Sequence, residues 1–229
     1  MSLRTSKWSG LLRVGIIAAA VLAVALPWIR ARAGGAVALP APAVDIARDG
    51  KPGKQTVVFA GGCFWGVQAV FQHVKGVADA TSGYAGGAAD IAKYDLVSTG
   101  DTGHAESVLV TFDPAQVAFG QLLRVFFSVT HDPTELNRQG PDEGTQYRSA
   151  LFFTDPAQKR VADAYIAQVD RAKSFHGRIV TEVAPLEAFY PAEAYHQNYA
   201  TIHPNDPYIV INDAPKVAHL RQMFPELYR

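Results

Sequence analysis

The single cysteine of this 229-residue chain, Cys63, stands between an apolar run and a helical pattern. Residues 55–60 read as a short buried strand, and apolar residues recur at helical spacing from 64 to 71. Gly61 and Gly62 between them suit a tight strand-to-helix turn. A thiol at the start of a helix faces free N–H groups and the positive end of the helix dipole, which lowers its pKa. The sequence therefore predicts a nucleophilic cysteine rather than a small buried hydrophobe.

The first 33 residues predict export. Arg4, Lys7 and Arg13 form a basic start to this segment, and Arg30 and Arg32 lie near its end. An apolar stretch over 14–29 follows, shorter than the roughly 20 residues of a membrane span, and 31–33 fits small-x-small cleavage. Two interpretations stay open: a signal peptide cleaved after Ala33, or an uncleaved anchor over residues 11–29. Both place the remaining chain outside the cytoplasm, in a periplasm. There most cysteines are paired, so an unpaired one indicates a reactive thiol.

The amino-acid composition limits the classes of partner that this protein can bind. Lys plus Arg and Asp plus Glu both number 21, so no charge excess favours nucleic acid, and a membrane is expected only through the N-terminal anchor. Residues 34–55 are rich in Ala, Gly and Pro and are predicted to form a flexible linker. Residues 56–229 suit one domain, the catalytic one. The seven histidines show no ligand spacing, so no metal is expected.

The order of predicted elements favours the α+β class. The expected strands are 55–60, 77–84, 106–112, 149–153 and 179–183, and the expected helices are 64–71, 119–129 and 156–175. This order gives β-α-β-β-α-β, a ferredoxin-like two-layer sandwich, with extra elements and long ordered loops. Three loop segments, 94–106, 131–149 and 189–199, concentrate carboxylates and phenols near strand ends, where sites are built.

Six short motifs occur in an order that resembles the A-type peptide methionine sulfoxide reductases. They are Gly-Cys-Phe-Trp-Gly (62–66), Gly-Tyr-Ala-Gly-Gly (83–87), Thr-Gly-His-Ala-Glu (102–106), His-Asp-Pro-Thr (131–134), Gly-Thr-Gln-Tyr-Arg-Ser (144–149) and Tyr-His-Gln-Asn-Tyr (195–199). The likeness covers 56–229. It implies thiol-dependent reduction of methionine sulfoxide, protein-bound and free, to methionine. Each sulfoxide epimer has its own reductase, and the resemblance implies the S-epimer for the A type.

The resemblance also implies a role for each site residue. Cys63 would attack the sulfoxide sulfur, and Glu106 would protonate the oxygen, which requires a site apolar enough to raise the pKa of its carboxyl group. Tyr94 and Tyr147 match the tyrosines that bind the oxygen, and Asp142 matches a carboxylate that orients the site. Phe64 and Trp65 would form the apolar slot for the methyl group.

Attack would leave Cys63 as a sulfenic acid. The chain has no second cysteine, and Ser98 stands where some relatives carry a resolving one. An external thiol must therefore regenerate the enzyme: a small thiol, a thioredoxin-like domain or a glutaredoxin-like donor. The expected partners are this donor and oxidised methionine-containing proteins or peptides, and the enzyme is expected to be a monomer without a cofactor.

Two other functions use the same residues. An exported cysteine hydrolase would pair Cys63 with His104, His131 or His196. An exported peptide-binding module would use the aromatic residues as a docking cleft. Dependence on a reductant distinguishes all three, because only repair consumes thiol.

Overall fold

A computed structural model describes residues 35–47 and 53–229. The predicted signal peptide or anchor lies outside these residues. The strands are β1 (Gln55–Gly61), β2 (Val77–Ala85), β3 (Ala105–Phe112), β4 (Arg138–Gln139), β5 (Asp142–Glu143), β6 (Ser149–Phe153), β7 (Glu182–Pro185) and β8 (Phe189–Pro191). The α-helices are α1 (Phe64–Gln72), α2 (Tyr94–Val97), α3 (Phe119–Val125), α4 (Pro156–Arg171), α5 (Tyr199–Ile202) and α6 (Ala214–Met223). Short helical turns are η1 (Ala89–Ile91), η2 (Phe126–Thr130), η3 (Thr145–Tyr147), η4 (Ala194–His196) and η5 (Ile209–Asp213).

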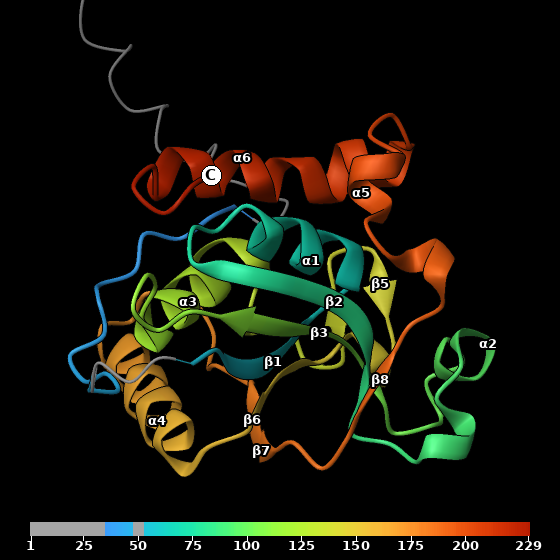
Figure 1. Cartoon of the computed structure of the whole chain (residues 1–229), viewed down its shortest axis with the longest axis horizontal. Helices are drawn as coiled ribbons and strands as arrows, with labels where there is room; N and C mark the ends of the chain where they lie inside the picture. The colour runs from blue at the N-terminus through green and yellow to red at the C-terminus, as the bar shows by residue number, and fades with distance from the viewer. Residues whose placement is uncertain (1–34, 48–52) are drawn as a thin grey trace, which may run out of the picture. The chain divides into compact units, whose positions relative to one another are not determined.

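The main sheet is mixed and has the strand order β7-β6-β1-β3-β2-β8. The pairs are antiparallel except β6 with β7, which is parallel, and β4 and β5 form a separate small sheet. Helices α1 and α3 connect strands of this sheet, and α6 crosses the outside of α1 (Figure 1). The α+β class predicted from the sequence is confirmed.

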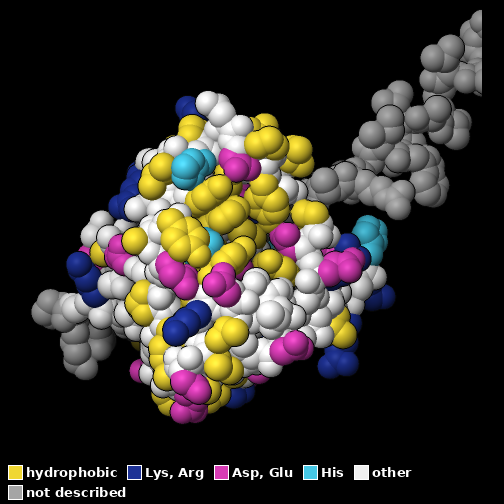
Figure 2. Space-filling view, turned by 90° about the vertical axis from the view of Figure 1, so that its right-hand side faces the viewer, with side chains coloured by type: hydrophobic (Ala, Val, Ile, Leu, Met, Phe, Trp, Pro, Cys, Tyr) yellow, Lys and Arg dark blue, Asp and Glu magenta, His cyan; other side chains and the backbone are white. Residues whose placement is uncertain are grey.

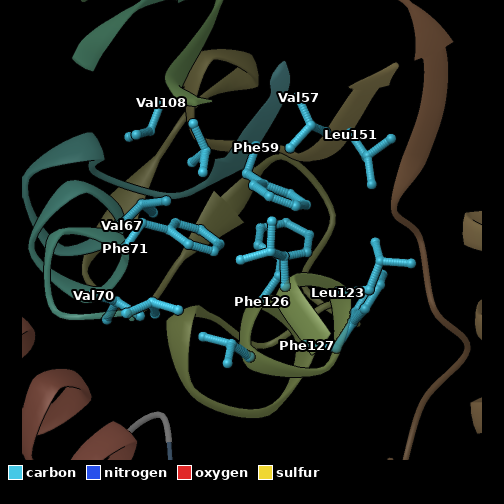
Figure 3. Close-up of a cluster of buried hydrophobic side chains, with 14 of the residues drawn as sticks. Val57, Phe59, Val67, Val70, Phe71, Val108, Leu123, Phe126, Phe127 and Leu151 are labelled. Carbon is cyan, nitrogen blue, oxygen red and sulfur yellow. The ribbon is translucent and has the colours of Figure 1, made fainter. Parts of the chain in front are cut away.

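The two faces of β1 bury different partners. Val57 and Phe59 point into the large core, which also takes side chains from α1, α3, α4 and α6. Phe59 stacks between Phe71 and Phe126, with ring centroids 4.8 Å and 4.7 Å away (Figure 3). Val58 and Ala60 belong to a smaller cluster formed by strand residues, mostly alanines. Because both faces are covered, β1 is a continuous apolar run, and it holds the start of α1 rigidly.

Three predicted boundaries differ from the structure. The helix expected over 119–129 is α-helical only to Val125 and continues as the π-helical η2. The helix expected over 156–175 begins correctly, with Asp155 accepting a hydrogen bond from Ala157 N–H, but it ends at Arg171 because Lys173 adopts a left-handed φ of 50°. The strand expected over 179–183 is β7, which lies about three residues later.

The predicted linker is not a free tether over its described part. Residues 35–47 lie along α3 and α4, where the side chains of Arg124 and Tyr165 donate to the carbonyl oxygens of Leu39 and Pro40 at 2.8 and 2.9 Å. Leu39 is buried in the main core. Its apolar burial and these hydrogen bonds outweigh the local Pro and Gly composition on which the prediction rested. Within the described ranges, no helix is long and apolar enough to cross a bilayer.

Candidate active site

Cys63 lies at the turn from β1 into α1, as the sequence predicts. Gly62 adopts a φ of +84°, and a Cβ there would come within 2.6 Å of the Gln139 side chain, so only glycine fits. Cys63 is the N-cap residue of α1 and is 8% exposed. It lines a pocket of about 360 Å³ together with Gln139, Gly140, Pro141, Asp142, Tyr208, Ile211, Asn212, Pro215, Lys216 and His219. The sulfur is therefore buried yet accessible.

This pocket lies between residues 139–142, around β4 and β5, and residues 208–219 of η5 and α6. The elements β5, α2 and α5 lie at one end of the view in Figure 1. Figure 2 looks at that end, and apolar side chains gather on the upper half of the face, bordered by acidic ones. Exposed apolar residues from the neighbouring segments include Ile202, Val210 and Ile211. An apolar rim of this kind suits a thioether and its surrounding peptide better than a charged substrate.

Glu106 reaches the start of α1 from the neighbouring strand β3. Its side chain is 2% exposed, and its Oε2 accepts a hydrogen bond of 3.1 Å from the Phe64 N–H. Burial raises the pKa of Glu106 to about 8, and the charges of Asp142 and Asp213 act in the same direction against that hydrogen bond. The carboxyl group is therefore protonated at neutral pH, as a proton donor must be.

The pKa of Cys63 is raised, whereas the sequence predicts a lowered one. Burial is the largest cause, and the carboxyl groups of Glu106 and Asp213 add to it. The Trp65 N–H at the helix start and the Lys216 ammonium group lower the pKa but do not outweigh burial. Cys63 is therefore held as a thiol, and the helix start alone does not ionise it.

Tyr94 and Tyr147 are both half-buried, at the start of α2 and the end of η3. Burial raises the pKa of each phenol, and the negative charge of Glu106 is the next cause. Within residues 35–47 and 53–229, neither hydroxyl group makes a hydrogen bond. Both are neutral donors, and they lie close enough to Glu106 for its ionised form to raise their pKa.

Asp142 has a hydrogen-bond partner that the sequence analysis missed. The Tyr208 hydroxyl group donates to Asp142 Oδ2, and both residues line the pocket. Burial raises the pKa of Asp142, while this hydrogen bond lowers it. Tyr208 follows Asp206-Pro207, and its N–H donates to Asp206 Oδ1 at 2.8 Å. That turn was a signal that could have identified it as a held aromatic residue.

The two residues expected to form the methyl slot differ in exposure. Phe64 is 1% exposed and belongs to the core, whereas Trp65 is half-buried. The Trp65 indole stacks on Tyr199 at 3.7 Å with an interplanar angle of 7°, and Tyr208 meets it edge-on at 5.8 Å. The Trp65 Nε1–H donates to His196 Nδ1 at 3.2 Å. Trp65 is thus the more accessible wall of the two.

The run 195–199 ties the C-terminal segment to α1. Gln68 donates from its Nε2 to Gln197 Oε1 at 3.0 Å and accepts from the Asn198 N–H at 2.8 Å. These bonds carry Tyr199 to Trp65, so the segment builds one side of the aromatic wall.

The three histidines considered for a hydrolase have other partners. His131 contacts Ser149 Oγ at 2.7 Å, His104 contacts Thr102, and His196 receives the Trp65 indole. None of them lines the pocket beside Cys63. The hydrolase alternative is therefore unsupported. In the described ranges, no group of three or more His, Cys, Asp or Glu residues is placed to hold a metal ion.

Comparisons with known proteins point to one family. The family model for peptide methionine sulfoxide reductase matches residues 55–227. Peptide methionine sulfoxide reductase MsrA 2 of Mesorhizobium japonicum is 60% identical over 177 residues, which cover 77% of this chain and 91% of that protein. The MsrA 2 protein of Synechocystis is 50% identical over 190 residues, which cover 82% and 89%.

Solved structures point the same way. Mxr1 from Saccharomyces cerevisiae in reduced form has a TM-score of 0.60 and 32% identity, covering 72% of this chain and 92% of that one. Methionine sulfoxide reductase A of Corynebacterium diphtheriae has a TM-score of 0.60 and 36% identity, covering 73% and 84%. The match of the family model over most of the chain, together with these identities, shows that this chain belongs to the peptide methionine sulfoxide reductases of the A type, enzymes that reduce methionine sulfoxide.

Proposed function

We propose that the enzyme reduces the S-epimer of methionine sulfoxide, free or within exported proteins, with Cys63 as nucleophile and Glu106 as proton donor. One observation carries this proposal: the Phe64 N–H holds the protonated carboxyl group of Glu106 at the first residue after Cys63. A soft nucleophile and an acid must act on adjacent atoms of a sulfoxide, and this hydrogen bond joins their two elements.

The remaining site residues orient the substrate. The sulfoxide methyl group packs against the Trp65 indole, with Phe64 beneath it in the core. The sulfoxide oxygen faces Glu106 and accepts hydrogen bonds from Tyr94 and Tyr147, whose hydroxyl groups stay neutral because burial raises their pKa. Asp142 and Tyr208 are joined by a hydrogen bond and form a further part of the pocket wall. Substrate chirality at sulfur decides which group faces the donors and which faces the indole, and this arrangement selects one epimer.

The reaction transfers one oxygen atom and two electrons. The Cys63 sulfur attacks the sulfoxide sulfur while Glu106 gives its proton to the oxygen, and the thiol proton restores the Glu106 carboxyl group. This attack joins the two sulfur atoms by an S–S bond. That bond and the S–O bond of the substrate then break as an S–O bond to Cys63 forms, leaving methionine and a cysteine sulfenic acid. Because burial raises the pKa of the Cys63 thiol, its nucleophilic character develops as the thiol proton passes to Glu106 during the attack.

An external thiol regenerates Cys63, since the chain has no other cysteine. A first thiolate attacks the sulfenic sulfur, giving a mixed disulfide and water. A second thiol then releases Cys63 and leaves the donor as a disulfide. A small thiol, a thioredoxin-like domain and a glutaredoxin-like protein are all candidate donors.

The decisive experiment incubates the purified domain with each epimer of methionine sulfoxide, with and without dithiothreitol. We expect turnover of the S-epimer with dithiothreitol and about one methionine per chain without it, because each Cys63 can accept one oxygen. Cys63→Ser should be inactive, and Ser98→Ala, on the α2 side of the fold, should be unchanged. Reduction of the R-epimer alone, or activity retained in Cys63→Ser, would refute the proposal.

We also propose that the domain works outside the cytoplasm, because its N-terminal 33 residues resemble an export signal. Cell fractionation with mass spectrometry of the mature N-terminus tests this. A start at Gly34 in the periplasm supports cleavage, an intact membrane-bound chain supports the anchor, and a cytoplasmic enzyme contradicts both.

The sheet order β6-β1-β3-β2, with α1 and α3 as its crossovers, leads us to infer a ferredoxin-like core for this domain.

A further inference from the structure

A buried ion pair lies beside the pocket and has no role in the chemistry derived above. Asp213 ends η5 and is 0% exposed, and Lys216 follows three residues later in α6. The Lys216 Nζ contacts Asp213 Oδ1 at 3.0 Å, and its side chain is 14% exposed. Removing such charges from water is costly, so a pair at this position needs a reason other than stability.

The pair lies against the first turn of α1. A Cβ added to Gly66 would come within 2.1 Å of Asp213 Oδ1 and 2.8 Å of Lys216 Nζ. Gly66 lies three residues after Cys63, so both charges pack on the turn that the thiol caps. Lys216 also lines the pocket into which Cys63 opens, and among the residues that the structure describes it is the only lysine or arginine to do so.

The charged and titratable groups around Cys63, the pair included, are mostly carboxyl groups and phenols. They are Glu106 on β3, Asp142 on β5, Asp213 on η5, Tyr94 on α2, Tyr147 on η3, Tyr199 on α5, Tyr208 before η5, and Lys216 and His219 on α6. A cysteine anion surrounded by carboxyl groups and phenols is disfavoured unless a cation faces it. Among these groups, Lys216 alone carries a permanent positive charge.

We propose that Lys216, held in place by Asp213, stabilises the anionic form of the Cys63 sulfur during nucleophilic attack. This proposal rests on the function proposed above and adds a residue to its machinery. Asp213 fixes the ammonium group beside the helix start, at the cost of a negative charge near the same sulfur. The two members of the pair therefore act on the thiol with opposite signs.

Opposite signs separate this role from a structural one. If the pair only held α6 against α1, removing either member would disturb Cys63 in the same way. If Lys216 acts through its charge, removing Asp213 favours the thiolate, and removing Lys216 as well reverses that gain. The Asp213→Asn background is used for the comparison because a buried aspartate left without its lysine would take up a proton and hide the effect.

The test measures the rate of Cys63 alkylation by iodoacetamide against pH, without any sulfoxide. All variants carry Glu106→Gln, so that no second group near the sulfur titrates in the same range. Asp213→Asn is expected to lower the apparent thiol pKa by about one unit, which is about a ten-fold gain in thiolate below that pKa. Asp213→Asn/Lys216→Met is expected to lose this gain, and Asp213→Asn/Lys216→Arg is expected to keep it, because arginine retains the charge.

Lys159→Met is the matched control, since it removes a lysine paired at 2.6 Å with Asp163 on α4, which contributes no residue to the pocket. Its alkylation profile should not change. Equal pKa values in the Met and Arg variants, or shifts in the same direction on removing Asp213 and then Lys216, would overturn the proposal. If the Met variant does not fold, Lys216→Gln replaces it with the same expectation. Because alkylation needs no sulfoxide, the result stands apart from the epimer assay.

Discussion

The Phe64 N–H donates a 3.1 Å hydrogen bond to Glu106 Oε2, so the residue that follows the proposed nucleophile, Cys63, also holds the proposed acid. A protonated carboxyl group can accept at one oxygen and donate from the other. The bond therefore leaves the Glu106 proton available to the substrate, and it keeps the acid and the thiol in one fixed geometry.

Glu106→Gln tests this arrangement. The amide keeps an acceptor for Phe64 but cannot give up a proton, so we expect the single-turnover rate of methionine formation to fall about 10²- to 10⁴-fold. Substrate affinity, measured by quenching of Trp65 fluorescence, should change little. Glu182→Gln is the control. Glu182 is exposed, does not line the pocket, and forms a 3.2 Å ion pair with Arg148. An equal loss of binding and rate would assign Glu106 to substrate binding instead.

The raised pKa of Glu106 also predicts how stability depends on pH. Between about 4.5 and about 8 the folded enzyme holds a proton on Glu106 that the unfolded chain has lost. The free energy of unfolding should therefore decrease as the pH rises through this window. Urea denaturation of the parent and of Glu106→Gln at several pH values checks this. Toward pH 8, the free energy of unfolding of the variant should rise relative to that of the parent. A difference between the two that does not depend on pH would contradict the shifted pKa of Glu106.

The single-turnover rate should depend on the protonation of the Glu106 carboxyl group in the same way. Glu106 donates only while it is protonated, so single-turnover rates should decline as the pH passes about 8. Rapid-quench measurements of methionine formation across this range give the profile. A rate that keeps rising well above this pH would mean that ionisation of Cys63, rather than the acid, controls the reaction.

Tyr147→Phe removes one of the neutral donors expected to face the sulfoxide oxygen. Loss of a single hydrogen bond to the developing charge, worth about 1–3 kcal/mol, should lower kcat/KM about ten- to hundred-fold. The double variant with Tyr94→Phe should lose more than either single one. Tyr165→Phe serves as the control, because Tyr165 lies on α4 and donates to the Pro40 carbonyl oxygen at 2.9 Å. Full activity of the double variant would remove both tyrosines from the site.

Gly66→Ala tests how closely Asp213 packs on α1. The new methyl group would lie 2.1 Å from Asp213 Oδ1, so the carboxylate must move, and we expect a loss of about 1–3 kcal/mol in the free energy of unfolding. In the Asp213→Ala background the same substitution should cost much less, because the space is open. Urea denaturation of the four proteins gives the coupling energy. Additive effects would show that the two residues are not in contact.

Local patterns account for the elements that hold the nucleophile. β1 and α1 agree with their predicted ranges within a residue, because a buried apolar run followed by helical periodicity allows few other structures. Cys63 was identifiable because its residue type is unique in the chain and its neighbours set its position. The predicted limits of β7 were wrong because parallel pairing with β6 sets them. In this pairing Ala150 lies opposite Glu182, about thirty residues further along the chain.

The surroundings of the sulfur depended on the tertiary structure. Tyr208 and Asp142 are 66 positions apart, and Lys216 reaches the pocket from the C-terminal helix, so no local spacing connects them to Cys63. The protonation state of Cys63 follows from burial and from carboxyl groups on β3 and η5, which only folding brings together. The sequence by itself singled out the proposed nucleophile, the Cys63 sulfur, and the helix that Cys63 caps. The tertiary structure decided that this atom rests as a thiol, because the long-range field around a buried group outweighs the helix start next to it.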